Sequence, residues 1–304
     1  ISIPYASFDD FPFEYPVREH GDFRIPAFAA EPASGITYSQ LEFHSFEVQK
    51  GKPAIAGLPS VFASQEEAET LKIICEDPTA GIRVTLFYSI IDNLSIVLRH
   101  QKIDNVGRHS LRLHNVQSLS LELPPQPYEF LSLYGSHAKE SNRSRFPLHY
   151  GIQRIESLRG SSSPQNQPFF ALMSPNITEE HGEVYGFHLV YSGNFLAQAE
   201  KDSFGNVRAQ IGLHPESFSW VLEPGETFET PEAVLNYSDS GLNQLSQNFH
   251  QLYLEHLIPP QFTRRTRPIL LNSWEAMYCN VSMEKIDIQS SLAKDLCIVL
   301  FVLD

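Results

Sequence analysis

The chain has 304 residues, and 36 Asp and Glu against 22 Lys and Arg give a formal net charge of −14. With 42% hydrophobic and 19% charged residues, its composition is that of an ordinary globular protein and excludes a disordered or collagen-like chain. The acidic balance argues against a nucleic-acid footprint, and no window of about 18 uncharged apolar residues predicts a membrane span.

Residues 1–241 carry strand signals and almost no helical period. Apolar and polar positions alternate through 81–99 on both sides of a short turn, which predicts a β-hairpin. The alternation continues in 110–123, and 185–199 predicts a second hairpin around a Gly-containing turn. Many short strands separated by Pro and Gly predict one large two-sheet domain, a β-supersandwich.

The pattern changes to a helical one at residue 242. Apolar side chains recur three, four and seven positions apart up to Leu257, and Pro259 and Pro260 follow, so residues 242–261 are predicted to form a linker helix. Ser240 is its expected N-cap.

Residues 262–304 have the pattern of an α/β domain. A short strand is predicted over 267–273, a helix over 283–294 and a second strand over 298–303. A strand, a helix and a strand joined by short loops form a β-α-β unit, so the two strands are expected to be parallel. The run from Cys297 to Leu303 reads as a buried strand that needs neighbours on both sides, so we expect this domain to continue beyond residue 304.

The three cysteines, Cys75, Cys279 and Cys297, form no C-x-x-C pair. They predict neither a disulfide framework nor a zinc site, and the scattered histidines show no metal-binding spacing. A reducing, cytoplasmic location is therefore the default expectation. Several Asn-x-Ser/Thr sequons leave a secreted protein open as the alternative.

The candidate ligand groups follow the two predicted strands of the α/β segment. Trp274 and Glu275 come after the first strand, and Asp304 comes after the second. Side chains at the C-terminal ends of barrel strands line ligand sites. A tryptophan offers a flat surface to the apolar side of a sugar, and carboxylates accept hydrogen bonds from hydroxyl groups, so these residues indicate sugar binding.

Motifs along nearly the whole chain support a family resemblance. They occur in order as Glu14-Tyr-Pro, Gly21-Asp-Phe-Arg24, Gly57-Leu-Pro59, Arg159-Gly-Ser-Ser-Ser163, Ser219-Trp-Val-Leu-Glu-Pro-Gly-Glu226, Asn272-Ser-Trp-Glu-Ala-Met-Tyr278 and Leu300-Phe-Val-Leu-Asp304. This series resembles glycoside hydrolase family 36, the α-galactosidases. Met277 and the pair Cys279-Asn280 depart from the usual family pattern, which puts the local shape of the site wall in question.

The resemblance implies a retaining α-galactosidase for melibiose, raffinose and related α-galactosides, with no metal and no cofactor. It implies a mainly β chain, in which a supersandwich over 1–241 and a linker helix over 242–261 precede the first β-α-β of a (β/α)8 barrel over 262–304. The resemblance implies no catalytic residue within this chain, because the motifs that carry the family's nucleophile Asp and its acid/base Asp do not occur in it. The chain alone is therefore expected to be inactive.

The resemblance also implies four substrate-binding residues. Asp304 matches the family Asp that bonds galactose hydroxyls, and Trp274 matches an aromatic wall. Asp22 and Phe23 match a loop that reaches into a neighbouring subunit's active site, which implies a homotetramer. Trp220 is expected in the core or in an interface. The alternative to an enzyme is a non-catalytic carbohydrate-binding or oligomerisation module made of the supersandwich.

Overall fold

The computed structural model describes residues 11–37 and 39–303. The contacts divide the chain into two units, Ile1–Leu257 and Ile258–Asp304. The first unit is built from strands with one long helix, and the second contains two short strands and three helices among its described residues. The prediction of a mainly β chain that ends in a β-α-β segment is confirmed.

The largest element of the first unit is a ten-stranded sheet in which every pair of neighbours is antiparallel. Its path is β2 (Glu42–Lys50), β3 (Ala68–Asp77), β4 (Ile82–Ile91), β5 (Ile96–Asn105), β17 (Glu232–Ser238), β12 (Val184–Val190), β11 (Asn166–Met173), β8 (Glu129–Ser136) and β9 (Lys139–Pro147), with β16 (Thr227–Glu229) paired to β5. The predicted hairpin over 81–99 is confirmed as β4 and β5.

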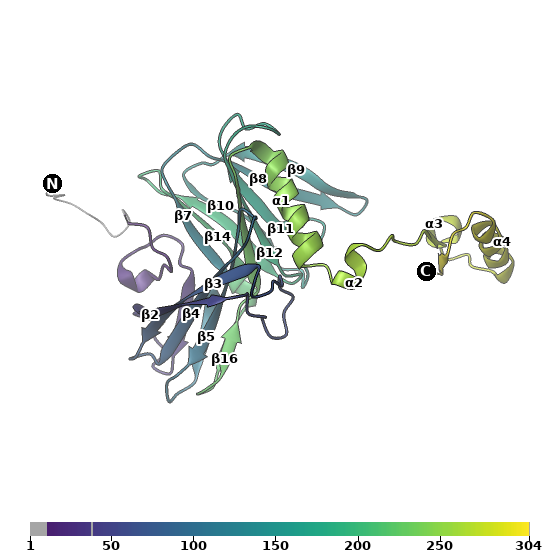
Figure 1. The fold of residues 1–304 in the computed structure, drawn as a ribbon. Helices are drawn as coiled ribbons and strands as arrows, with labels where there is room; N and C mark the ends of the chain where they lie inside the picture. The colour runs from purple at the N-terminus through teal and green to yellow at the C-terminus, as the bar shows by residue number, and fades with distance from the viewer. Residues whose placement is uncertain (1–10, 38, 304) are drawn as a thin grey trace. The chain divides into compact units, whose positions relative to one another are not determined.

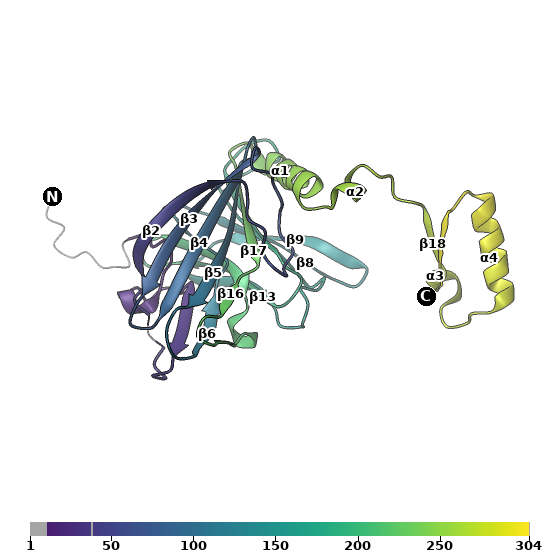
Figure 2. The ribbon, with the colours of Figure 1, turned by 60° about the horizontal axis from the view of Figure 1, so that its bottom comes forward.

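Two smaller antiparallel sheets pack against this large sheet (Figures 1 and 2). One contains β10 (Gly151–Ser157), β13 (Phe195–Lys201), β14 (Val207–Leu213) and β7 (Leu119–Leu123), and the other contains β1 (Phe28–Pro32), β6 (Leu111–Val116) and β15 (Trp220–Leu222). Two short 3-10 helices are η2 (Arg18–His20) and η3 (Pro215–Ser217). Apolar residues at alternate strand positions form a separate core under each small sheet, as period-2 patterning requires.

The predicted second hairpin, over 185–199, is wrong. Both arms are strands, β12 and β13, but β12 pairs with β11 and β17, whereas β13 pairs with β10 and β14. The turn at Tyr191–Asn194 therefore carries the chain from the large sheet into the four-stranded sheet. Alternation identifies a strand, but the facing core decides which strand it pairs with.

The helix α1 (Gly241–His256) packs on the large sheet over β12 and β17 (Figure 1). Its buried apolar residues Leu245, Phe249 and Leu252 follow helical spacing and join a core of their own. Gly186 on β12 permits this close approach, because a Cβ there would lie 3.0 Å from the Phe249 ring. Ser240 is the N-cap residue, but its side chain makes no capping hydrogen bond.

The second unit consists of α2 (Pro260–Thr263), β18 (Leu270–Asn272), α3 (Trp274–Met277), α4 (Met283–Asp295) and β19 (Leu300–Val302). β18 and β19 pair in parallel, which confirms the predicted β-α-β arrangement, although both strands are shorter than predicted. Ser282 caps α4 by accepting a hydrogen bond from the Lys285 backbone N–H at 3.3 Å.

A buried ion pair fastens the segment after β2 to β17. The Lys52 Nζ lies 2.7 Å from the Glu232 carboxylate, and both side chains are 0% exposed. The second carboxylate oxygen of Glu232 accepts the Val61 backbone N–H at 2.7 Å. Burial raises the pKa of Glu232, and the charge of Lys52 opposes that rise. Both ends of the 52–61 segment are thus tied to one carboxylate.

Acid should weaken this fold through His100, which is buried on β5 and stacks on Phe87 with ring centroids 4.4 Å apart. Burial and the positive charge of Lys52 lower the pKa of His100 to about 3, whereas an unfolded histidine has a pKa of about 6.5. Below that value the unfolded state binds more protons than the folded state, so stability falls as the pH decreases.

We expect the unfolding free energy to drop between pH 6.5 and pH 5 by about 2 kcal/mol more in the wild type than in His100→Phe. Urea unfolding of both proteins at the two pH values measures this difference. Equal pH dependence in the two proteins would show that His100 is not the responsible group.

Candidate functional site

The loop that contains Asp22 and Phe23 is held by a buried cluster of charges. Both carboxylate oxygens of Asp22 are enclosed: Oδ1 accepts the Arg24 Nε at 3.0 Å, and Oδ2 accepts hydrogen bonds from Arg24 and Arg208. Arg208, on β14, is 0% exposed and also donates to Glu122 on β7 and to the Ile25 carbonyl. The loop is therefore fastened to the four-stranded sheet.

The electrostatics of this cluster favour a charged Asp22. Burial alone would raise the pKa of Asp22, but hydrogen bonds from Arg24 and Arg208 outweigh it and leave the pKa below its usual value. The neighbouring Glu122 has a raised pKa, because burial exceeds the effect of the same arginines. With Asp202, whose Oδ2 lies 3.6 Å from Arg24 Nη1, two guanidinium groups and three carboxylates thus share one site.

Phe23 has the opposite environment. Its side chain is 81% exposed, although the residues on either side, Asp22 and Arg24, are buried. Tyr150, which is 76% exposed, lines the same shallow cavity of about 400 Å³. A rigid loop that presents an exposed aromatic ring is the form expected for a contact residue, with the buried carboxylate beneath it as its support.

The other candidate residues belong to the second unit. Trp274 begins α3 directly after β18 and is 42% exposed, with Tyr278 in an edge-to-face contact at 5.5 Å between ring centroids. Its backbone N–H donates to the Asn272 Oδ1 at 2.7 Å. Asn272 pairs with Val302, so β18 and β19 end at the same edge. Asp304 lies outside the described residues.

The residues that the sequence reasoning missed are Arg208 and Glu122. One signal was available: in β14 the apolar side chains of Val207, Ala209 and Ile211 enter the core, which leaves Arg208 and Gln210 together on the other face. Two such residues in an otherwise apolar strand indicate a buried partner. Their partner in the 22–25 loop is distant in sequence, and pattern analysis could not identify it.

Residues 11–37 and 39–303 contain neither a metal-binding cluster nor a membrane-spanning helix. No three His, Cys, Asp or Glu side chains in these ranges are grouped so that they could hold a metal ion. No helix there has the length and hydropathy needed to cross a bilayer. Cys75, Cys279 and Cys297 are free thiols.

Comparison with known proteins agrees with this architecture of a supersandwich followed by the start of an α/β domain. The family model described as "Glycosyl hydrolase family 36 N-terminal domain" matches residues 4–223, and the model "Melibiase" matches residues 227–304. The first covers more than half of the chain. The chain belongs to glycoside hydrolase family 36.

Individual relatives are similar over nearly the whole chain. "Alpha-galactosidase AgaA" of Geobacillus stearothermophilus is 43% identical over 98% of this chain, and "Alpha-galactosidase C" of Emericella nidulans is 41% identical over 96%. The chain spans 41% and 39% of the length of these two proteins. A solved AgaA variant in complex with stachyose superposes with a TM-score of 0.95 at 42% identity, covering 98% of this chain and 42% of that one.

Proposed function

We propose that this chain is the N-terminal part of a retaining α-galactosidase that hydrolyses terminal α-galactosides such as melibiose and the raffinose-type oligosaccharides. The observation that carries the proposal is the 43% identity to an α-galactosidase over 98% of the chain. Solved structures of AgaA variants with raffinose and with stachyose, at 42% identity, support the substrate class.

The chemistry of a retaining glycosidase needs two carboxyl groups about 5 Å apart, one as nucleophile and one as acid/base. According to the family resemblance, the nucleophile and the acid/base residue both lie on later strands of the barrel. We therefore propose that this segment contributes walls of the substrate site and no reacting group. The segment alone should not hydrolyse α-galactosides, and no metal or cofactor is part of the proposal.

Each candidate residue has a role in this proposal. Trp274 forms an aromatic wall at the edge where β18 ends, and Asp304 accepts hydrogen bonds from galactose hydroxyls. Phe23 contacts the sugar in a neighbouring subunit of a homotetramer. Its exposure supports that role, whereas the burial of Asp22 supports a role in holding the loop. Three free thiols fit a reducing, cytoplasmic location.

The test compares the complete protein with residues 1–304 in an assay with p-nitrophenyl α-galactoside and raffinose. We expect hydrolysis by the complete protein and none by the segment. In the complete protein, Phe23→Ala should lower kcat/KM about tenfold, the size of one lost aromatic contact. Phe43→Ala, at a phenylalanine that is 65% exposed on β2, is the matched control and should leave kcat/KM unchanged.

Two results would contradict the proposal. A complete protein with no activity on either substrate would remove the enzyme assignment and favour the second candidate, a non-catalytic carbohydrate-binding or oligomerisation module formed by the supersandwich. Equal kcat/KM in Phe23→Ala and Phe43→Ala would remove the contact proposed for Phe23.

A further inference from the structure

A second concave site lies in the first unit, where the chain crosses between its sheets. A cavity of about 710 Å³ opens between the turn after β12, the segment around η3, and strands β15 and β16. The volume is in the range of small-molecule sites. The Gly57-Leu58 segment and Gly160 complete the wall. Three of the family motifs therefore meet here, and the function proposed above uses none of them.

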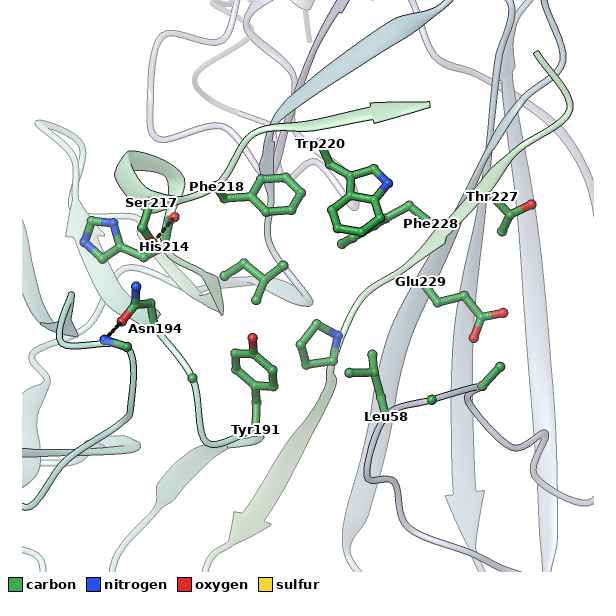
Figure 3. A pocket seen from close by; sticks show the side chains of 16 residues that line it. Leu58, Tyr191, Asn194, His214, Ser217, Phe218, Trp220, Thr227, Phe228 and Glu229 are labelled. Carbon is green, nitrogen blue, oxygen red and sulfur yellow. Dashed lines mark hydrogen bonds between the residues drawn. The ribbon is translucent and has the colours of Figure 1, made fainter. Parts of the chain in front are cut away.

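Aromatic rings form one side of this cavity. Trp220 on β15 is 50% exposed, so of the two environments expected for it, core or interface, it does not lie in the core. Its ring lies 5.5 Å from that of Phe228, which in turn lies 5.3 Å from that of Phe218. Figure 3 shows Phe218 and Trp220 along one side, with Tyr191 opposite and its hydroxyl pointing into the space between them.

The polar groups that line the cavity use only part of their hydrogen-bonding capacity within the described part of the chain. The Glu229 Oε2 is buried and has no hydrogen-bond partner in the described part of the chain. Asn194 accepts the Gly160 backbone N–H through its Oδ1 at 2.7 Å, which leaves its NH₂ group for a ligand. His214 is already bonded to Glu156 through Nε2 at 3.1 Å and therefore serves as wall. The cavity thus offers both acceptors and donors beside an apolar surface.

The charge of the lining identifies the class of ligand. The 16 lining residues, all of them described, include one carboxylate and no Lys or Arg. A phosphate or carboxylate ligand would meet a carboxylate with no cation to balance it, which disfavours anions. A neutral sugar presents an apolar face to aromatic rings and hydroxyl groups to Glu229, Tyr191 and Asn194. We propose that this cavity binds a unit of a neutral oligosaccharide, with Trp220 as its stacking surface.

The structure offers a direct test, because the chain has two tryptophans, Trp220 and Trp274. Each gives one indole N–H signal in a ¹⁵N–¹H correlation spectrum of residues 1–304, and Trp274→Phe assigns them. Titration with stachyose should shift the Trp220 signal with a Kd on the order of 1 mM, typical of one weak aromatic sugar contact. Galactose 6-phosphate should shift it less at the same concentration.

Three variants examine the site by isothermal titration calorimetry with stachyose, because one of them lacks the Trp220 indole signal. Trp220→Ala should raise the Kd at least tenfold, and Glu229→Gln should raise it severalfold because an amide replaces the carboxylate acceptor. Phe43→Ala, an exposed aromatic residue on β2 outside the cavity, should leave the Kd unchanged. Unchanged dispersion of the remaining spectrum checks that each variant is folded.

The proposal is overturned if stachyose shifts neither indole signal at 20 times the expected Kd, or if it shifts only that of Trp274. Equal shifts with galactose 6-phosphate would overturn the ligand class. These outcomes are independent of the galactosidase assay on the complete protein, since that assay measures hydrolysis and this one measures binding to the first unit.

Discussion

Replacing Arg208 with methionine should destabilise the first unit by about 3–5 kcal/mol, the cost of removing one partner from a buried charge network. The guanidinium group is 0% exposed and bonds Asp22, Glu122 and the Ile25 carbonyl. Methionine fills much of the same volume but carries no positive charge to balance the carboxylates of Asp22 and Glu122. Asp22 and Glu122 would then keep only Arg24 between them.

The matched control is Arg154→Met on β10, in the same sheet. Arg154 pairs with Glu156 at 3.0 Å, but its side chain is 49% exposed, and exposed pairs contribute about 0–1 kcal/mol. Urea unfolding followed by circular dichroism gives both values. A loss below 1 kcal/mol in Arg208→Met would show that the buried network does not stabilise the loop.

Lys52→Met should have an effect of the same size for a different reason. It leaves Glu232 in a 0% exposed position without its counter-ion, which costs about 3–5 kcal/mol. Loss of the positive charge removes the interaction that opposes the raised pKa of Glu232. A group with a raised folded pKa binds a proton more readily in the folded state, so the variant should lose stability as the pH rises.

The double variant Lys52→Met with Glu232→Gln separates charge from packing. The amide oxygen of glutamine can still accept the Val61 N–H, and no buried charge remains. We expect the double variant to be more stable than Lys52→Met at pH 7 and to lose its extra pH dependence. Lys72→Met, at a 3.6 Å pair with a 60% exposed Glu47, is the control and should change little. A double variant as unstable as Lys52→Met would contradict the assignment to charge.

The sequence predicted the strands well and their partners less well. β4 and β5 were identified correctly because a tight turn leaves two alternating segments no option but to pair. The same reasoning failed for β12 and β13, where the Gly193 turn is a corner between sheets. A period-2 pattern identifies the buried face of a strand, and the core that covers this face is made by distant residues.

At the candidate site, too, the sequence identifies residues but not the partners that hold them. Asp22 and Phe23 are candidates because a short motif resembles a family, and Trp274 is one also because it follows a predicted strand. Such patterns state which residues are present but not how they are held. The partner of Asp22, Arg208, lies 186 positions away, and Glu232 holds Val61 across 171 positions. Such pairings depend on the full three-dimensional structure. Trp220 was expected in the core or in an interface, and local patterning could not decide between them; on the three-stranded sheet its ring is half exposed.

The order of strands in the large sheet has a consequence for how the chain acquires its structure. β17 (Glu232–Ser238) lies between β5 and β12, although it is the last of these strands to be synthesised. Until it emerges from the ribosome, β5 and β12 each have an unpaired edge, and Lys52 has no counter-ion. Folding of this sheet must therefore wait for residue 238 and should be slow, because its central contacts join distant positions. The nascent chain is then most prone to aggregate through those two edges. Pairing of β17 with β5 and β12 covers both edges and ends this exposure.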